Sequence, residues 1–198
     1  GLPAVLHALE ESVGTEGTLV LPAHSWRWVN DGAREFDVRH TPTCVGALPS
    51  AFLDWPQVHP SVHPTHSVAA VGPAAETLVA GHQQPAKPCG TGTPYERLLT
   101  SGGQMLFLGV DLSSNTGFHT VEALADVPYL MNDRPDRFQL TDRDGHSTNV
   151  EMFIHRQDVA RRFAEMQDEL QQQQILKKGQ VGAATALLVD GRQCIEYM

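Results

Sequence analysis

The stretch QMLFLGVDLSSNTGFHTVEALA, residues 104–125, decides the fold class. Its first part, Gln104–Val110, is apolar enough to predict a central β-strand. A polar loop, Asp111–Gly117, follows, and Phe118–Ala125 has the composition of a short helix. A buried strand that leads through a loop into a helix is typical of domains that layer helices on a sheet.

Outside this stretch, helix-like and strand-like segments alternate. Helices are predicted where apolar residues recur at helical spacing, or where Pro opens a segment, namely Leu2–Val13, Pro73–Gly81, Pro94–Leu99 and Gln157–Lys178. Strands are predicted in short apolar runs, namely Gly17–Pro22, Ser67–Gly72, Asn149–Ile154 and Gln180–Asp190. We therefore expect an α/β (α+β layered) fold, in which a mixed central sheet is flanked by helices, and a single domain over residues 1–198.

Two segments show neither the helical spacing of apolar residues nor the short apolar runs of strands. Residues 23–64 are rich in Pro, His, Trp and Asp, and they predict a long functional loop region with a short helix near Gly46–Leu53. Residues 130–147 predict a loop with polar turns. Long loops in a compact domain are uncommon and are usually functional or disordered, so we look for a site built partly from loops.

Composition excludes several classes of protein. The formal net charge of the 198 residues is −9, and no basic patch of the kind that binds duplex DNA is present. No apolar run approaches the ~20 residues of a membrane-spanning helix, and no secretory signal is visible. The three cysteines, Cys44, Cys89 and Cys194, lie far apart, which favours a reducing compartment. We expect a cytoplasmic protein that binds neither nucleic acid nor membranes, as a monomer or homodimer.

The strongest candidate for chemistry is the segment Asn115–Glu122, directly after the predicted central strand. His119 and Glu122 are three residues apart, so they share one face of a helix. A carboxylate beside an imidazole holds its tautomer and raises its basicity, which suits a general base. The alternative is an N-capped helix that carries a surface His–Glu pair, and spacing alone leaves both interpretations open.

Two further clusters have functional and structural interpretations. His59, His63 and His66 could bind zinc for a hydrolase, although histidines that hydrogen-bond across a loop give the same pattern. Trp26–Trp28 with Phe36-Asp37 could line a pocket for a cationic, sugar-like ligand, or could instead pin the loop through buried aromatic rings. Sequence motifs of serine hydrolases, P-loop NTPases and zincins are absent.

The order of several motifs resembles the aminoglycoside N3-acetyltransferases, a family distinct from the GNAT fold. The motifs that carry the resemblance extend over nearly the whole chain: Gly17–Pro22, Phe36-Asp37, Thr41-Pro42, Gly46–Pro49, His63–Gly72, Gly90–Leu98, Leu108–Val110, Asn115–Glu122 and Gly179–Asp190. The family has a further N-terminal segment with a His-Ser-Ser-like loop. Because the chain starts at Gly1-Leu-Pro, inside that region, we expect a domain without this segment. If the missing part holds the cofactor, a non-catalytic binding fragment is a further alternative.

The resemblance implies acetyl transfer from acetyl-CoA, as co-substrate and without a metal, to the 3-amino group of a 2-deoxystreptamine antibiotic. A protonated amine cannot attack a thioester, so the reaction needs a base. We assign this role to His119, with Glu122 orienting it, and expect backbone N–H groups or the Thr116 hydroxyl to stabilise the oxyanion. It also implies that Ser67 and Val68 contact coenzyme A, and that Asp37 and His66 bind the cationic substrate. A different amine substrate of the same family is the alternative.

Overall fold

The computed structural model describes residues 1–198, which divide into two compact units. Unit 1 comprises Gly1–Pro88, Gly92–Pro94 and Asp133–Ile154. Unit 2 comprises Cys89–Thr91, Tyr95–Asn132 and His155–Met198. No helix combines the length and the hydropathy that a membrane crossing demands.

Unit 1 contains two three-stranded sheets. Its helices are α1 (Leu2–Val13), α2 (Trp26–Asn30), α3 (Ala47–Leu53) and α4 (Ala75–Val79), and its strands are β1 (Leu19–Pro22), β2 (Glu35–Asp37), β3 (His59–Pro60), β4 (Val68–Val71), β6 (Asp136–Thr141) and β7 (Ser147–Met152). The antiparallel sheet β1-β4-β3 covers a core around Leu6 and Phe52. In the second sheet, β2 lies parallel to β6, and β6 and β7 form a hairpin over Phe36 and Phe138.

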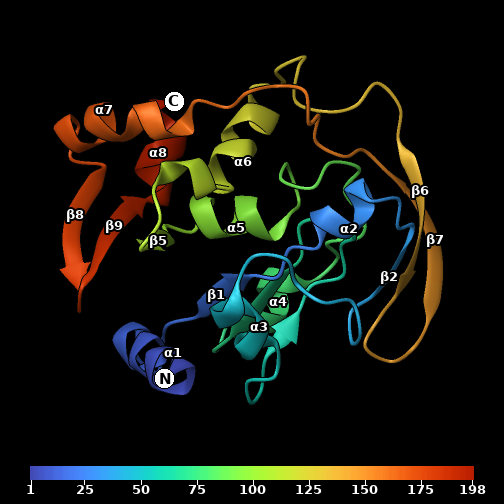
Figure 1. The fold of residues 1–198 in the computed structure, drawn as a ribbon, viewed down its shortest axis with the longest axis horizontal. Coiled ribbons are helices and arrows are strands. Elements are labelled where there is room, and N and C mark those ends of the chain that lie inside the picture. Colours follow the sequence, from blue (N-terminus) through green and yellow to red (C-terminus); the bar gives the residue numbers. More distant parts are fainter. The chain divides into compact units, whose positions relative to one another are not determined.

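Unit 2 contains one antiparallel sheet, in the order β5-β9-β8. Its elements are α5 (Pro94–Thr100), β5 (Gln104–Leu108), the 3-10 helix η1 (Leu112–Ser114), α6 (Gly117–Leu124), the 3-10 helix η2 (Phe163–Met166), α7 (Gln167–Gln172), β8 (Leu176–Val181), β9 (Ala184–Asp190) and α8 (Gly191–Tyr197). Its core includes Phe107, Leu112, Phe118 and Leu170. The β8–β9 hairpin and the helices α6 and α7 can be followed in Figure 1.

The mixed α/β class predicted from sequence is confirmed, with three small sheets in place of one central sheet. The predicted helix Leu2–Val13 has the observed bounds, and Gly14 ends it with a positive φ of 70°. The segment 23–64 is largely irregular but also contains α2, β2 and β3, which were not predicted.

Three predictions were wrong. The strand β5, predicted to be central, lies at the edge of its sheet, because β9 occupies the middle and pairs with β5 on one side and β8 on the other. In agreement with this position, Leu106 of β5 is 43% exposed. Residues 136–141 form β6 where a loop was predicted, because Phe138 and Leu140 alternate with exposed residues and fill a core.

The third error is the helix predicted over 157–178. Only η2 and α7 are helical there, and the chain turns at Gln174, whose φ is positive, before β8 begins at Leu176. Phe163, Met166 and Leu170 do pack on the core of unit 2, so the apolar stripe was real. The residues from Leu176 onwards pair with β9 as a strand. This tertiary pairing outweighs the helical spacing of the apolar residues in the sequence.

Candidate active site

Helix α6 brings His119 and Glu122 together. Phe118 and Val121 on the same helix are buried, so the helix is anchored by its apolar face. The Nδ1 atom of His119 lies 2.7 Å from Oε2 of Glu122, and the two side chains are only 17% and 12% exposed. A carboxylate only accepts hydrogen bonds, so this contact places the ring proton on Nδ1 and the lone pair on Nε2. That tautomer is the one that a general base requires.

Two aromatic rings from a distant part of the sequence pack on the His119 ring. The centroid of the buried His155 ring lies 4.3 Å away at an interplanar angle of 33°. The Phe163 ring meets His119 edge-on at 5.1 Å, and it meets Phe118 in the same manner. His155 is held by a β-bridge to Met131. Sequence analysis missed both contacts, because only the folded chain brings residues 155 and 163 to α6.

Thr116 and Asn115 precede this helix. Thr116 is the N-cap residue, and its carbonyl accepts the N–H of His119 at 3.0 Å, while its hydroxyl makes no capping bond. Asn115 is 1% exposed, and neither Nδ2 nor Oδ1 has a hydrogen-bond partner. A Cβ at position 117 would meet the sulfur of Met105, so any residue larger than Gly117 would require that side chain to move. Thr116, His119 and Glu122 therefore lie along one short segment of unit 2.

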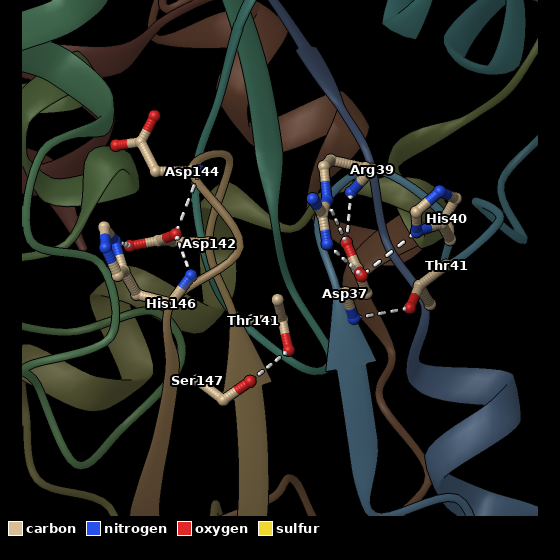
Figure 2. Close-up of polar contacts among 9 residues, drawn as sticks. All are labelled: Asp37, Arg39, His40, Thr41, Thr141, Asp142, Asp144, His146 and Ser147. Carbon is tan, nitrogen blue, oxygen red and sulfur yellow. Dashed lines mark hydrogen bonds and ion pairs between the residues drawn. The ribbon is translucent and has the colours of Figure 1, made fainter.

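Asp37 lies in unit 1, at the end of β2, and both of its oxygens are occupied (Figure 2). Oδ1 accepts from the backbone N–H and Nε of Arg39 at 2.9 and 3.1 Å, and Oδ2 contacts Nη2 of Arg39 at 2.9 Å and Nδ1 of His40 at 3.0 Å. The hydrogen bonds from Arg39, and then that from His40, hold the pKa of the Asp37 carboxyl far below its usual value. Asp37 thus organises its own turn, which Thr41 closes.

The predicted coenzyme A and substrate residues at the start of β4 are buried in unit 1. The hydroxyl of Ser67 donates to the carbonyl of His63 at 2.7 Å, and the N–H of Val68 donates to the Ser61 hydroxyl at 2.9 Å. The Nδ1 atom of His66 lies 2.8 Å from the hydroxyl of Thr65, and its ring packs on another imidazole, that of His24, at 4.8 Å. These groups stabilise the turn that leads into β4.

The histidines proposed for zinc do not form a metal site. His59, His63 and His66 do not bring three ligand atoms within reach of one ion. His63 instead accepts the backbone N–H groups of Thr65 and His66 on its Nδ1 atom, which is the loop-stabilising interpretation. The one group with suitable spacing is Asp142, Asp144 and His146, at the exposed tip of the β6–β7 hairpin (Figure 2).

Neither of the two buried thiols fits the role of a nucleophile. Cys89 is fully buried, and burial together with the charge of Glu122 raises the pKa of its thiol well above the usual value. Burial also raises the pKa of Cys194, to about 11. A thiolate, not a thiol, is the attacking species, so both cysteines are inert near neutral pH.

Comparison with known proteins gives a consistent result. The sequence model of a family described as aminoglycoside 3-N-acetyltransferase matches residues 1–198. The chain is 32% identical to aminoglycoside N(3)-acetyltransferase IV of Salmonella sp. over 96% of its own length and 70% of that protein.

Two solved structures extend the comparison. A histidine-to-alanine variant of aminoglycoside acetyltransferase AAC(3)-IVa, in complex with a gentamicin, superposes with a TM-score of 0.82 at 30% identity and covers 99% of this chain and 72% of that one. AAC-IIIb, solved as a binary complex with CoASH, superposes with a TM-score of 0.79 at 26% identity over all of this chain and 81% of that one.

Proposed function

The chain belongs to the aminoglycoside 3-N-acetyltransferase family, and we propose that it transfers the acetyl group of acetyl-CoA to the 3-amino group of a 2-deoxystreptamine aminoglycoside. The observation that carries the proposal is the 2.7 Å contact between His119 and Glu122 on a half-buried face of α6. Relatives solved with a gentamicin and with CoASH support the two substrates.

The reaction follows from the tautomer of His119. Its Nε2 atom removes a proton from the substrate ammonium, and the resulting amine attacks the thioester carbonyl, forming a C–N bond. The imidazolium is stabilised by the carboxylate of Glu122. When the tetrahedral intermediate collapses, the C–S bond breaks, and the sulfur of coenzyme A leaves with the electron pair and takes up the proton that the His119 imidazolium holds on Nε2. The second proton of the attacking nitrogen is lost to solvent.

The oxyanion of the intermediate needs a donor. We assign this role to the Thr116 hydroxyl, which α6 does not use for capping, at a helix end whose dipole favours negative charge. We expect direct transfer, since the two buried thiols of unit 2, Cys89 and Cys194, are protonated at neutral pH and cannot carry the acyl group.

The assignments in unit 1 stay predictions. Asp37 can bind an ammonium group of the substrate only by exchanging Arg39 or His40 for it, because both of its oxygens are occupied. His66 as a second substrate contact, and Ser67 and Val68 as contacts of the pantetheine arm, require the turn before β4 to open, because all three are buried. The free state of all three cysteines supports the cytoplasm as the proposed compartment.

Thiol release from acetyl-CoA in the presence of a panel of aminoglycosides tests the proposal. We expect release that depends on the aminoglycoside, and a loss of ~10²–10⁴-fold in kcat for His119→Ala. His146→Ala, which removes an exposed imidazole that also faces a carboxylate, is the matched control and should retain wild-type turnover. Near-wild-type turnover in His119→Ala would reject the assignment of the base. Turnover with simple amines but not with aminoglycosides would favour the alternative substrate class.

A further inference from the structure

We propose that the ring of His155 positions the base, by fixing the plane in which the His119 imidazole faces Glu122; the inference rests on the proposed function. The two imidazole rings have centroids 4.3 Å apart and an interplanar angle of 33°. His155 is 5% exposed, and all three residues belong to unit 2. The mechanism gives His155 no proton to move, so its effect on the reaction comes through the ring that it contacts.

The hydrogen bond to Glu122 does not by itself fix the plane of the His119 ring. The torsion that turns an imidazole about its bond to Cβ has broad minima, so a single contact at Nδ1 leaves the ring free to tilt. A tilt displaces Nε2, the atom that must reach the substrate ammonium, and a misplacement of about 1 Å can cost ~10²-fold in rate. A flat group packed on the ring face restricts this tilt, because tilting would drive the ring into it.

The backbone around His155 is fixed by contacts with a second chain segment. His155 forms a β-bridge with Met131, and the N–H of Arg156 donates to the carbonyl of Leu130 at 3.0 Å. The side-chain amide of Gln157 donates to the carbonyl of His155 itself at 2.9 Å. Leu130 is only 1% exposed, so this segment is anchored in the interior. The position of the supporting ring is therefore set by segments outside α6.

Phe163 supports the His119 ring from a second direction. Its ring meets His119 at a centroid distance of 5.1 Å and an angle of 66°, whereas the His155 ring lies at 33°. The two rings therefore restrict rotation of the imidazole about different directions. Phe163 also packs against the core of unit 2, so its loss would change stability as well. His155 is therefore the better position at which to test the support of the base.

The supporting ring must also be uncharged when His119 takes up its proton. A second cation at 4.3 Å would oppose formation of the imidazolium, which the carboxylate of Glu122 stabilises. Burial favours the neutral form of an imidazole, so a buried histidine meets this condition. Position 155 thus requires a side chain that is flat and uncharged. Phenylalanine satisfies both requirements, whereas leucine is uncharged but not flat.

The test compares His155→Leu with His155→Phe in thiol release from acetyl-CoA with a gentamicin-type aminoglycoside. We expect His155→Leu to lower kcat roughly 10- to 100-fold and to change KM for either substrate by less than about twofold, because Nε2 is misplaced while no substrate contact is lost. His155→Phe should keep kcat within about threefold of wild type, since the flat face is retained and only the fit of a larger ring changes. Val189→Ala, which removes buried methyl groups from the core of unit 2, is the control for stability and should keep the wild-type kcat.

A spectroscopic measurement follows the His119 ring without turnover. Spectra that correlate the ring protons and nitrogens of histidine report which nitrogen carries the proton, and the His119 signals are identified by their absence in His119→Ala. We expect the Nδ1–H tautomer in wild type and in His155→Phe. His155→Leu should show a mixture of both tautomers, because a tilted ring loses its contact with Glu122.

Equal losses of kcat in His155→Leu and His155→Phe would overturn the proposal, because the imidazole itself and not its flat face would then be needed. An equal loss in Val189→Ala would also overturn it, since the effect would then follow stability. A wild type that acetylates no aminoglycoside, but whose His119 tautomer changes in His155→Leu, refutes the proposed function and keeps the positioning role. A wild type that turns over aminoglycosides, with kcat and tautomer unchanged in His155→Leu, refutes the positioning role alone.

Discussion

Replacing Glu122 by Gln keeps the size of the side chain and removes its charge. In the structure the carboxylate lies 2.7 Å from Nδ1 of His119, and both groups are less than one-fifth exposed, so solvent screens the pair weakly. A hydrogen bond to a charged group is worth about 1.5–3 kcal/mol, and most of this is gained when His119 becomes an imidazolium in the transition state. We therefore expect kcat to fall on the order of 10- to 100-fold with little change in KM.

The assay is thiol release at saturating acetyl-CoA, with kcat and KM determined separately for Glu122→Gln. The control is Glu151→Gln, which makes the same change in an exposed pair with Arg137 on β7 and should keep wild-type kinetics. A loss near ~10⁴-fold would mean that the new amide donates to Nδ1 and fixes the opposite tautomer. A kcat within twofold of wild type, with normal thermal stability, would refute the role of Glu122 and with it the dyad.

Three further predictions concern stability and thiol chemistry. Phe118→Ala should destabilise the protein by about 3–5 kcal/mol in urea unfolding, because this fully buried ring fills the core of unit 2. Under native conditions iodoacetamide should label the half-buried Cys44 but neither Cys89 nor Cys194, as mass spectrometry would read out; labelling of either buried thiol would contradict their inertness. Asp37→Asn should lower the free energy of unfolding by about 0.5–1 kcal/mol above pH ~5. This loss should shrink as the pH falls below the unfolded-state pKa of ~3.9 towards the lowered folded-state pKa, because the wild-type carboxylate then becomes protonated as well. Urea midpoints of variant and wild type that differ equally at pH 3 and pH 7 would argue against this.

Elements whose causes are local could be predicted from the sequence. Helix α1 has an early proline, apolar residues at helical spacing and a terminating Gly14, and its predicted and observed bounds agree. Two further elements were predicted to within one residue at each end: α5, which begins at Pro94, and β4, a short apolar run that is buried along its whole length. In each case the residues that determine the element lie within it or next to it.

Elements that depend on distant partners were the ones that failed. The spacing of Phe163, Met166 and Leu170 is that of one face of a continuous helix. Nothing in that segment of sequence indicates that Leu176 pairs with Val189 of β9. The segment 136–141 does carry a local signal for a strand, the alternation of Phe138 and Leu140 with exposed residues, but its pairing with the distant β2 could not be predicted. Sheet order is a property of pairing between segments, which a single-sequence pattern does not contain.

The candidate site divides in the same way. The pair His119 and Glu122 is a relation between residues three apart on one helix, so spacing alone could predict it. The rings of His155 and Phe163, which pack on His119, come from within and just before the segment that was predicted as a continuous helix, and the sequence pattern there gave no sign of these contacts. Sequence thus predicts that the base is paired with a carboxylate, whereas the ring nitrogen involved and the rings that pack on His119 are known only from the structure. Substitutions at 155 and 163 should therefore act through the orientation of His119, whereas those at 122 act through its charge.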